Sequence, residues 1–211
     1  MLGYTIAAAQ ACTKLTDFLV STDSLQIADI ARAGGAPVPF LRPGALATDE
    51  AAMPGVLQHA LEWYERRHQR RVHSVVTLQP TTPLRLAGDI DAAIEHYITC
   101  QPGADSLISV CESGQMHPVT LYRQDGMFAQ PLLSGRMQTT RRQEFDRVFW
   151  RNGAVYITRR DLLLEQNEVI GQRPLVYEMP RHRSVNIDDL FDFELAEWML
   201  SHEALERLDP T

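Results

Sequence analysis

The feature that most constrains the fold is the alternation of short apolar runs with helical patterns along the first half of the chain. In order, the strand-like and helical segments occupy residues 18–20, 24–33, 51–67, 74–78, 89–98 and 105–111. The apolar runs have the length of buried strands, and the helical segments repeat their apolar residues every three or four positions. This alternation predicts a parallel sheet wrapped by helices.

The second half is patterned less strongly. Residues 154–157 and 175–177 are strand-like, 161–166 and 189–200 are helical, and the stretch 119–149 has neither period clearly. A length of 211 residues suits one domain. We therefore expect a single domain over residues 1–211, with 119–149 as a small inserted arm.

Charge and cysteine content exclude several classes of protein. The chain has 20 Lys and Arg against 27 Asp and Glu, a net charge of -7, so we expect no nucleic-acid partner. The basic run 66–71 fits a solvated helix end, where cations offset the helix dipole. Three cysteines without a zinc-binding spacing fit a reduced, cytoplasmic protein. The uncharged start, 1–13, is too short to span a membrane.

Polar residues follow the apolar runs where a ligand site of a parallel sheet is expected, outside the carboxyl ends of the strands. Gln79 and Thr82 come directly after the run 74–78, in a turn that Pro80 and Pro83 fix. Gln79 is either a ligand-binding residue or a turn residue that hydrogen-bonds the backbone. Both readings are open from these residues alone.

A second candidate group lies before the last helix. Asn186 and Asp188 are two positions apart, so on an extended segment both side chains face the same side and could approach one cation. Mg²⁺ is commonly held by one or two carboxylates together with substrate oxygens. The alternative role for Asp188 is to cap the helix that starts near Asp189.

Ten segments in order, spread over nearly the whole chain, resemble the acylneuraminate cytidylyltransferase family. They are 3–6 (GYTI), 20–23 (VSTD), 39–43 (PFLRP), 46–49 (LATD), 59–63 (HALEW), 78–85 (LQPTTPLR), 89–91 (DID), 141–143 (RRQ), 152–157 (NGAVYI) and 184–188 (SVNID). The resemblance implies a doubly wound, mostly parallel sheet with helices on both faces, of the glycosyltransferase-A-like, nucleotide-diphospho-sugar transferase kind. It also implies a homodimer formed through the inserted arm.

The resemblance further implies a reaction and its residues. CTP and a nonulosonic, sialic-acid-like sugar would give the CMP-sugar and pyrophosphate, with Mg²⁺ sharing the phosphate charge. It implies that Asp188 is catalytic and binds the metal together with Asn186, where the family often has a second Asp. The substrate-binding positions implied are Arg42, Gln79, Thr82, Arg142, Gln143 and Asn152.

The resemblance departs from the family pattern at the start. Family members begin with a strand and a Gly-rich, basic loop before the GYTI helix, whereas here Gly3 is the third residue. Such a loop supplies backbone amides and a Lys to a triphosphate. We therefore expect a start upstream of Met1, a fragment, or an inactive relative. The last possibility leaves a second function open, that of a non-catalytic nucleotide- or sugar-binding protein.

Overall fold

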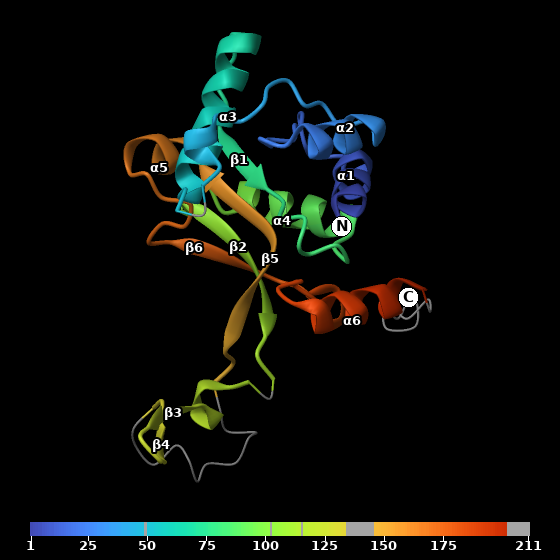
Figure 1. The fold of residues 1–211 in the computed structure, drawn as a ribbon. Coiled ribbons are helices and arrows are strands. Elements are labelled where there is room, and N and C mark those ends of the chain that lie inside the picture. Colours follow the sequence, from blue (N-terminus) through green and yellow to red (C-terminus); the bar gives the residue numbers. More distant parts are fainter. Residues whose placement is uncertain (49, 102, 115, 134–145, 202–211) are drawn as a thin grey trace.

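The computed structural model describes residues 1–48, 50–101, 103–114, 116–133 and 146–201. Its main sheet has the strand order β1-β5-β2-β6. The strands are β1 (Ser74–Thr77), β2 (Ser106–Glu112), β5 (Phe149–Arg159) and β6 (Pro174–Glu178). The helices are α1 (Leu2–Ala11), α2 (Leu25–Ala33), α3 (Met53–His68), α4 (Ala87–Thr99), α5 (Arg160–Glu165) and α6 (Leu190–Ser201) (Figure 1).

The prediction of a mostly parallel sheet is wrong. β5 runs antiparallel to both β1 and β2, and only β2 and β6 pair in parallel. The chain leaves β2, passes through the arm and returns beside the same strand as β5, and such a return makes an antiparallel pair. A strand that is buried on both faces has the same apolar pattern whether it pairs parallel or antiparallel. The sequence pattern therefore did not distinguish the two directions.

Helices cover both faces of the sheet, as predicted. Neighbouring residues of β1 show this, because successive side chains of a strand point to opposite faces. Val76 packs against the cluster built on Ile90 and Ile94 of α4, whereas Val75 packs against the cluster of α3 and α5. Both faces of β1 are therefore covered.

The arm contains a small hairpin of β3 (Tyr122–Asp125) and β4 (Phe128–Pro131). Figure 1 shows this hairpin standing off from the main body, beyond the far ends of β2 and β5. A separate two-stranded sheet therefore lies within the stretch 119–149, and the role of this stretch as an inserted dimerisation arm stays a prediction. Residues 134–145 of that arm lie outside the described residues.

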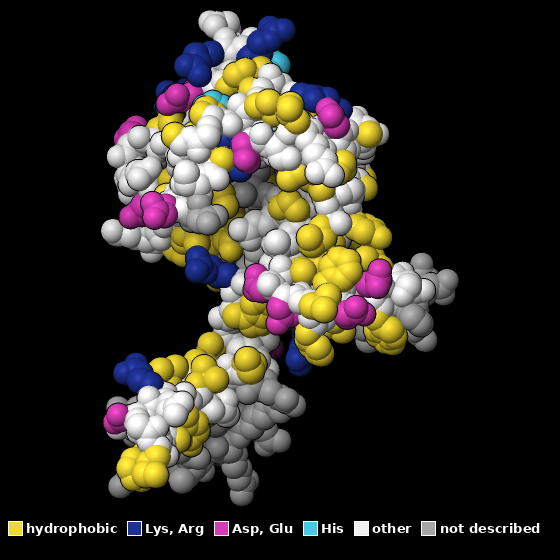
Figure 2. All heavy atoms as spheres, in the orientation of Figure 1, with side chains coloured by type: hydrophobic (Ala, Val, Ile, Leu, Met, Phe, Trp, Pro, Cys, Tyr) yellow, Lys and Arg dark blue, Asp and Glu magenta, His cyan; other side chains and the backbone are white. Residues whose placement is uncertain are grey.

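The predicted strand at 18–20 is not part of the sheet. The segment is extended and half-buried, and an isolated parallel bridge joins Thr22 to Leu41. Between this segment and β1 lies a cavity of about 840 Å³, lined by α1, α3, α4 and β1. Figure 2 shows the surface hollowed between β1 and α1. β1 is consequently an edge strand within the described part of the chain.

Within those same residues, no helix has both the length and the apolar character needed to cross a membrane.

Candidate functional site

Three polar side chains converge on Gly153, a residue of β5 with a positive φ of 75°. A Cβ atom at Gly153 would overlap Gln79 Oε1, and it would lie 3.3 Å from Thr82 Oγ1 and 3.5 Å from Asn186 Oδ1. Glycine is therefore required both for the backbone conformation and for the close approach of these oxygens. Gln79, Thr82 and Asn186 are all residues that the resemblance implied, and the fold brings them together from distant parts of the chain.

The Asn152 side chain, next to this convergence, is fully buried and fully bonded. Its Oδ1 accepts hydrogen bonds from Ser109 Oγ (2.6 Å) and from the backbone N–H of Ala154 (3.1 Å), and its Nδ2 donates to Ser184 Oγ (2.9 Å). Thr82 Oγ1 donates to the Asn152 carbonyl oxygen (3.0 Å). The Asn152 amide therefore holds the backbone after Gly153 in place, and Thr82 holds the backbone before it. Its contact with a substrate stays a prediction.

Arg85 joins the same region to α1. Its guanidinium donates to the carbonyl oxygens of Gln79 (3.3 Å) and Ala154 (2.5 Å) and to Thr5 Oγ1 (2.9 Å). Burial lowers the pKa of Arg85 to about 10, and the nearby Asp89 carboxylate opposes that change. Since Arg85 is 3% exposed and bonded to the backbone, its role is to fix the turn after β1.

A backbone hydrogen bond and a buried ion pair hold the segment before α6 beside the site. The Ile187 N–H donates to the Thr81 carbonyl oxygen at 2.8 Å, which places the segment beside the turn after β1. Farther back, Arg183 Nη2 lies 3.0 Å from Asp89 Oδ1 in a largely buried ion pair. Burial, with the Asp89 charge as the second cause, raises the pKa of the neighbouring Tyr177 to about 12. This buried pair anchors the segment that carries Asn186.

The cation candidates Asn186 and Asp188 lie together, but they do not make a complete set of protein ligands. Asn186 Nδ2 donates to Asp188 Oδ2 (2.9 Å), and its Oδ1 is buried with no hydrogen-bond partner among the described residues. Asp188 is exposed, and its N–H donates to Asp192 Oδ2 (3.1 Å). The described residues hold no group of three or more His, Cys, Asp or Glu that could bind a metal. One carboxylate with an unpaired amide oxygen nearby fits Mg²⁺ that takes its other ligands from water and phosphate.

Arg42 lies on the opposite wall of the cavity, which Gln79 also lines. Its Nη2 atom pairs with Asp23 Oδ1 at 2.9 Å, and this hydrogen bond is the main cause that lowers the pKa of Asp23. Arg42 Nε is buried and has no partner within the described chain. Arg42 thus keeps a buried donor available at the cavity wall. Arg142 and Gln143 lie outside the described residues.

Comparison with known proteins agrees with this geometry at the level of family. No protein-family model matches the chain. The post-translational flagellin modification protein B of Campylobacter coli is 30% identical over 99% of this chain and 87% of its own length. The CMP-N,N'-diacetyllegionaminic acid synthase of Legionella pneumophila is 30% identical over 97% of this chain and 88% of its own length.

The chain belongs to the acylneuraminate cytidylyltransferase family, also known as the CMP-nonulosonate synthetases. The N-acylneuraminate cytidylyltransferase of Escherichia coli is likewise 30% identical over 99% of the chain, which spans about half (48%) of that protein. In fold, the cytidylyltransferase chain is similar to a CMP:2-keto-3-deoxy-manno-octonic acid synthetase solved with CTP. The TM-score is 0.67 and the identity 14%, over 95% of this chain and 87% of the other.

Three residues that build this candidate site were missed from sequence. Ser109 and Ser184 hold Asn152, and Gly153 provides the space for Gln79. Ser184 and Gly153 fall within segments that carry the family resemblance, so the candidate residues next to them could have drawn attention to both. Ser109 is a small polar residue in an apolar strand, and its pairing with Asn152, 43 positions away, had no local signal.

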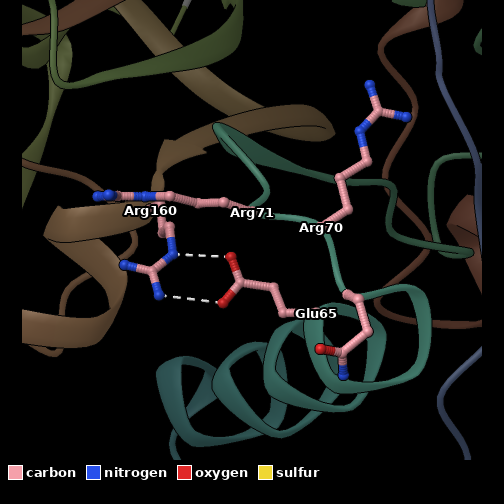
Figure 3. Close-up of a pocket in the computed structure, with 5 residues that line it drawn as sticks. Glu65, Arg70, Arg71 and Arg160 are labelled. Carbon is pink, nitrogen blue, oxygen red and sulfur yellow. Dashed lines mark hydrogen bonds and ion pairs between the residues drawn. The ribbon is translucent and has the colours of Figure 1, made fainter.

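A separate basic pocket surrounds the end of α3 (Figure 3). Arg160 binds Glu65 through two contacts, Nε to Oε1 at 2.8 Å and Nη2 to Oε2 at 3.0 Å. Figure 3 shows Arg70 pointing away from this pair and Arg71 extending past Arg160. Arg66, Arg67 and His68 occupy the last turn of α3, as expected for a basic helix end.

Proposed function

We propose that this family member transfers CMP from CTP to a nonulosonic, sialic-acid-like sugar and releases pyrophosphate. The observation that carries the proposal is the convergence of Gln79, Thr82 and Asn186 on Gly153, next to a cavity with a buried, unpaired Arg42 nitrogen. The names of the relatives support the substrate class, because they act on legionaminic and neuraminic acids.

In the proposed reaction the anomeric hydroxyl oxygen of the sugar attacks the α-phosphorus of CTP. A new oxygen–phosphorus bond forms, the bond to the β-phosphate oxygen breaks, and the hydroxyl proton passes to solvent. Such a transfer depends on positioning and on neutralising the phosphate charge, more than on a covalent protein nucleophile. Mg²⁺, when bound, would supply part of that neutralisation.

The chain's own residues would divide the work as follows. Gln79, fixed by Arg85 and opposite Gly153, would hydrogen-bond the sugar, with Thr82 beside it. Asp188 would hold Mg²⁺, aided by Asn186 through its unpaired Oδ1 or through a water. Arg42 would contact the nucleotide, because a guanidinium presents a rigid fork of donors. Arg142 and Gln143 stay predicted substrate contacts, as does Asn152.

Assembly is the second part of the proposal. The hairpin of the arm exposes large apolar side chains, among them Met127 (87% exposed) and Phe128 (72%). On α6, Phe191 is 75% exposed. Figure 2 shows such side chains gathered on the lower body and the arm. Exposed apolar patches of this kind mark contact surfaces, so we propose a homodimer through the arm. Sedimentation should show a dimer, and Phe128→Lys should give a monomer.

The proposal also places the protein in the cytoplasm, because all three cysteines are free thiols in the structure.

The decisive experiment measures pyrophosphate release from CTP and Mg²⁺, with N-acetylneuraminate and N,N'-diacetyllegionaminate as alternative acceptors. We expect turnover with at least one acceptor, and a loss of at least about tenfold for Gln79→Ala and Asp188→Asn. Glu168→Gln, an exposed change after α5, is the control and should leave the rate unchanged.

The alternative is a non-catalytic relative that binds nucleotide or sugar. It would be favoured if the folded protein binds CTP by calorimetry and releases no pyrophosphate with either acceptor.

A further inference from the structure

The end of α3 carries a run of cations in a chain whose net charge is -7. Residues 66–71 read RRHQRR. The helix dipole accounts for the three cations in the last turn of α3, because cations are favourable at a helix carboxyl end. It does not account for Arg70 and Arg71, since α3 ends at His68 and these two residues follow the helix. Their position therefore calls for a separate explanation.

A third arginine, from another helix, joins this run. Arg160, the first residue of α5, lines the same pocket as Arg70 and Arg71, and the pocket has a volume of about 340 Å³. In Figure 3 the Arg71 side chain extends past Arg160, whereas Arg70 points away from the Glu65–Arg160 pair. The fold thus gathers guanidinium groups from two segments far apart in sequence around one depression of the surface.

The carboxylate among the residues that line this pocket is already bonded. Glu65 Oε1 accepts from Arg160 Nε (2.8 Å) and from the Val72 N–H (2.8 Å), and Oε2 accepts from Arg160 Nη2 (3.0 Å). The hydrogen bond from Arg160 is the main cause that lowers the pKa of Glu65, and the charge of Arg71 also lowers it. Three guanidinium charges and one carboxylate charge leave the lining of the pocket with a net charge of +2.

Several donors of the pocket have no acceptor among the described residues. Arg160 uses Nε and Nη2 on Glu65, which leaves its Nη1 without a protein partner there. The guanidiniums of Arg70 and Arg71 likewise form no hydrogen bond or ion pair with the described part of the chain. Guanidinium groups repel one another, and each presents a planar fork of N–H donors. An oxyanion between them would gain charge-assisted hydrogen bonds and relieve the repulsion.

The two-residue loop 70–71 is fixed at both ends. Before the loop, Gln69 has a positive φ of 50°, and its Nε2 donates to the Arg66 carbonyl oxygen at 2.8 Å. After the loop, the His73 carbonyl oxygen accepts from the backbone N–H of Arg160 at 3.0 Å. This second bond ties the loop to α5. The backbone of the pocket is therefore ordered without a ligand, which lowers the entropy lost on binding.

Size and charge select a small anion as the occupant. A volume of about 340 Å³ is at the lower end of the roughly 300–1,000 Å³ of small-molecule sites. A long polyanion such as nucleic acid would meet the overall charge of -7, whereas a small anion meets mainly the local charge of the pocket. The guanidinium fork matches the spacing of phosphate oxygens, so the chemistry that fits best is that of a phosphate group.

We propose that Arg70, Arg71 and Arg160 form a binding site for a small phosphate-class oxyanion that carries two or more negative charges. Glu65 orients Arg160 so that its Nη1 is available to the anion, and the loop supplies the other guanidiniums. This site is separate from the convergence on Gly153, and the proposal does not rest on the proposed function.

The test titrates the full chain with inorganic pyrophosphate, without divalent metal, and follows the arginine Nε–H signals and the Val72 amide by NMR. We expect saturable shifts of the Arg71 and Arg160 signals, with a Kd below about 1 mM. Arg71→Gln should weaken this binding at least about tenfold. Arg71→Lys, which keeps the charge and loses the fork, should weaken it at least about threefold.

A matched control removes the same charge elsewhere. Arg173→Gln changes an exposed arginine that does not line the pocket, and it should bind pyrophosphate as the parent protein does. If Arg71→Gln does not fold, Arg70→Gln removes a second guanidinium of the same loop and should also weaken binding. Shifts that do not saturate below about 10 mM, or that are the same in the parent and in the folded loop variants, would overturn the proposal.

Two further arms identify the source of the anion. Inorganic phosphate and ribose 5-phosphate are titrated beside pyrophosphate. Tighter binding of pyrophosphate would support a free inorganic anion, and tighter binding of ribose 5-phosphate would support the phosphoryl group of a small metabolite. A short DNA duplex or phosphatidylglycerol vesicles that bind at least about tenfold more tightly, with the same dependence on Arg71, would overturn the small anion and identify a surface for a polyanion.

These readouts do not depend on enzyme activity, so the anion-site proposal and the proposed function can fail separately.

Discussion

The two sides of β5 differ in how their buried polar atoms are satisfied. Toward β2 and β6, Asn152, Ser109 and Ser184 form a closed network in which each side chain is bonded. Toward β1 and beyond it, Ser21 and Thr77 keep buried hydroxyls without partners beside an apolar cavity. The network side is complete within the described chain, and the cavity side is not.

This difference has an energetic meaning. A buried polar group without a partner costs about 1–3 kcal/mol, so the unpaired hydroxyls of Ser21 and Thr77 make the cavity side less stable than the network side. The comparison separates a fully bonded region around Gly153 from a cavity side that keeps unpaired buried polar groups.

The largest expected effect on stability comes from breaking the hydrogen-bond network around Asn152. Asn152→Ala would leave the Ser109 hydroxyl and the Ala154 N–H without their acceptor, and each unsatisfied buried group costs about 1–3 kcal/mol. We expect a loss of about 3–4 kcal/mol in the free energy of unfolding, measured by urea denaturation. A loss below about 1 kcal/mol would mean that the network is not what stabilises this side.

A second change tests the junction of the two sides. Gly153→Ala adds a Cβ that overlaps Gln79 Oε1 and forces alanine to a φ of 75°. Such a backbone conformation costs about 1–3 kcal/mol, so we expect about 2 kcal/mol of lost stability. Because Gln79 must move, kcat/KM for pyrophosphate release should fall at least about tenfold. Unchanged kcat/KM in the folded variant would separate Gln79 from the reaction.

The sharpest comparison uses one substitution at two threonines. Thr82→Val removes a bonded hydroxyl and leaves the Asn152 carbonyl unpaired, so we expect a loss of about 1–2 kcal/mol. Thr77→Val removes an unpaired buried hydroxyl, so its stability should stay the same or rise by up to about 1 kcal/mol. Thermal unfolding of both variants measures the difference. A Thr77→Val loss equal to that of Thr82→Val would show that Thr77 has a partner in solution.

The smallest effect concerns the ion pair at the end of α3, which lies outside both regions. The bidentate contact of Arg160 holds the pKa of the Glu65 carboxyl below its usual value. A lowered carboxyl pKa in the folded state gives stability that is present above the unfolded pKa near 4.5 and is lost as pH falls through the folded pKa.

Glu65→Gln should therefore cost about 0.5–1 kcal/mol at pH 7, and the gap to the parent protein should narrow below pH 4. Urea titrations at pH 3 and pH 7 measure this gap. A gap that is constant with pH would exclude the Glu65 charge as its source.

The candidate site residues came mainly from the family resemblance. Gln79 and Thr82 directly follow an apolar run, and Asn186 lies two positions before Asp188, but these local patterns left a turn role for Gln79 and a capping role for Asp188 open. Local patterns did not show that Gln79, Thr82 and Asn186 lie close together in the folded protein. The convergence on Gly153 depends on the Ile187 to Thr81 backbone bond and on the Arg183–Asp89 pair, which join residues about 100 positions apart.

The direction of β5 and the absence of the segment 18–20 from the described sheet were likewise not predictable from local sequence patterns. An apolar run records that a strand is buried, and it does not record which neighbour pairs with it or in which direction. β5 pairs antiparallel because the arm returns the chain beside β2. The segment 18–20 is extended but lies outside the sheet, since no described strand fills the space between it and β1.

The sequence by itself determined the layered α/β architecture and the family, because period, turn residues and motif order are local properties of the chain. The tertiary structure decided the mixed sheet, the closed Asn152 network and the cavity beside β1. These depend on contacts between segments far apart in sequence, whose energies come from packing and hydrogen bonds that no local pattern contains.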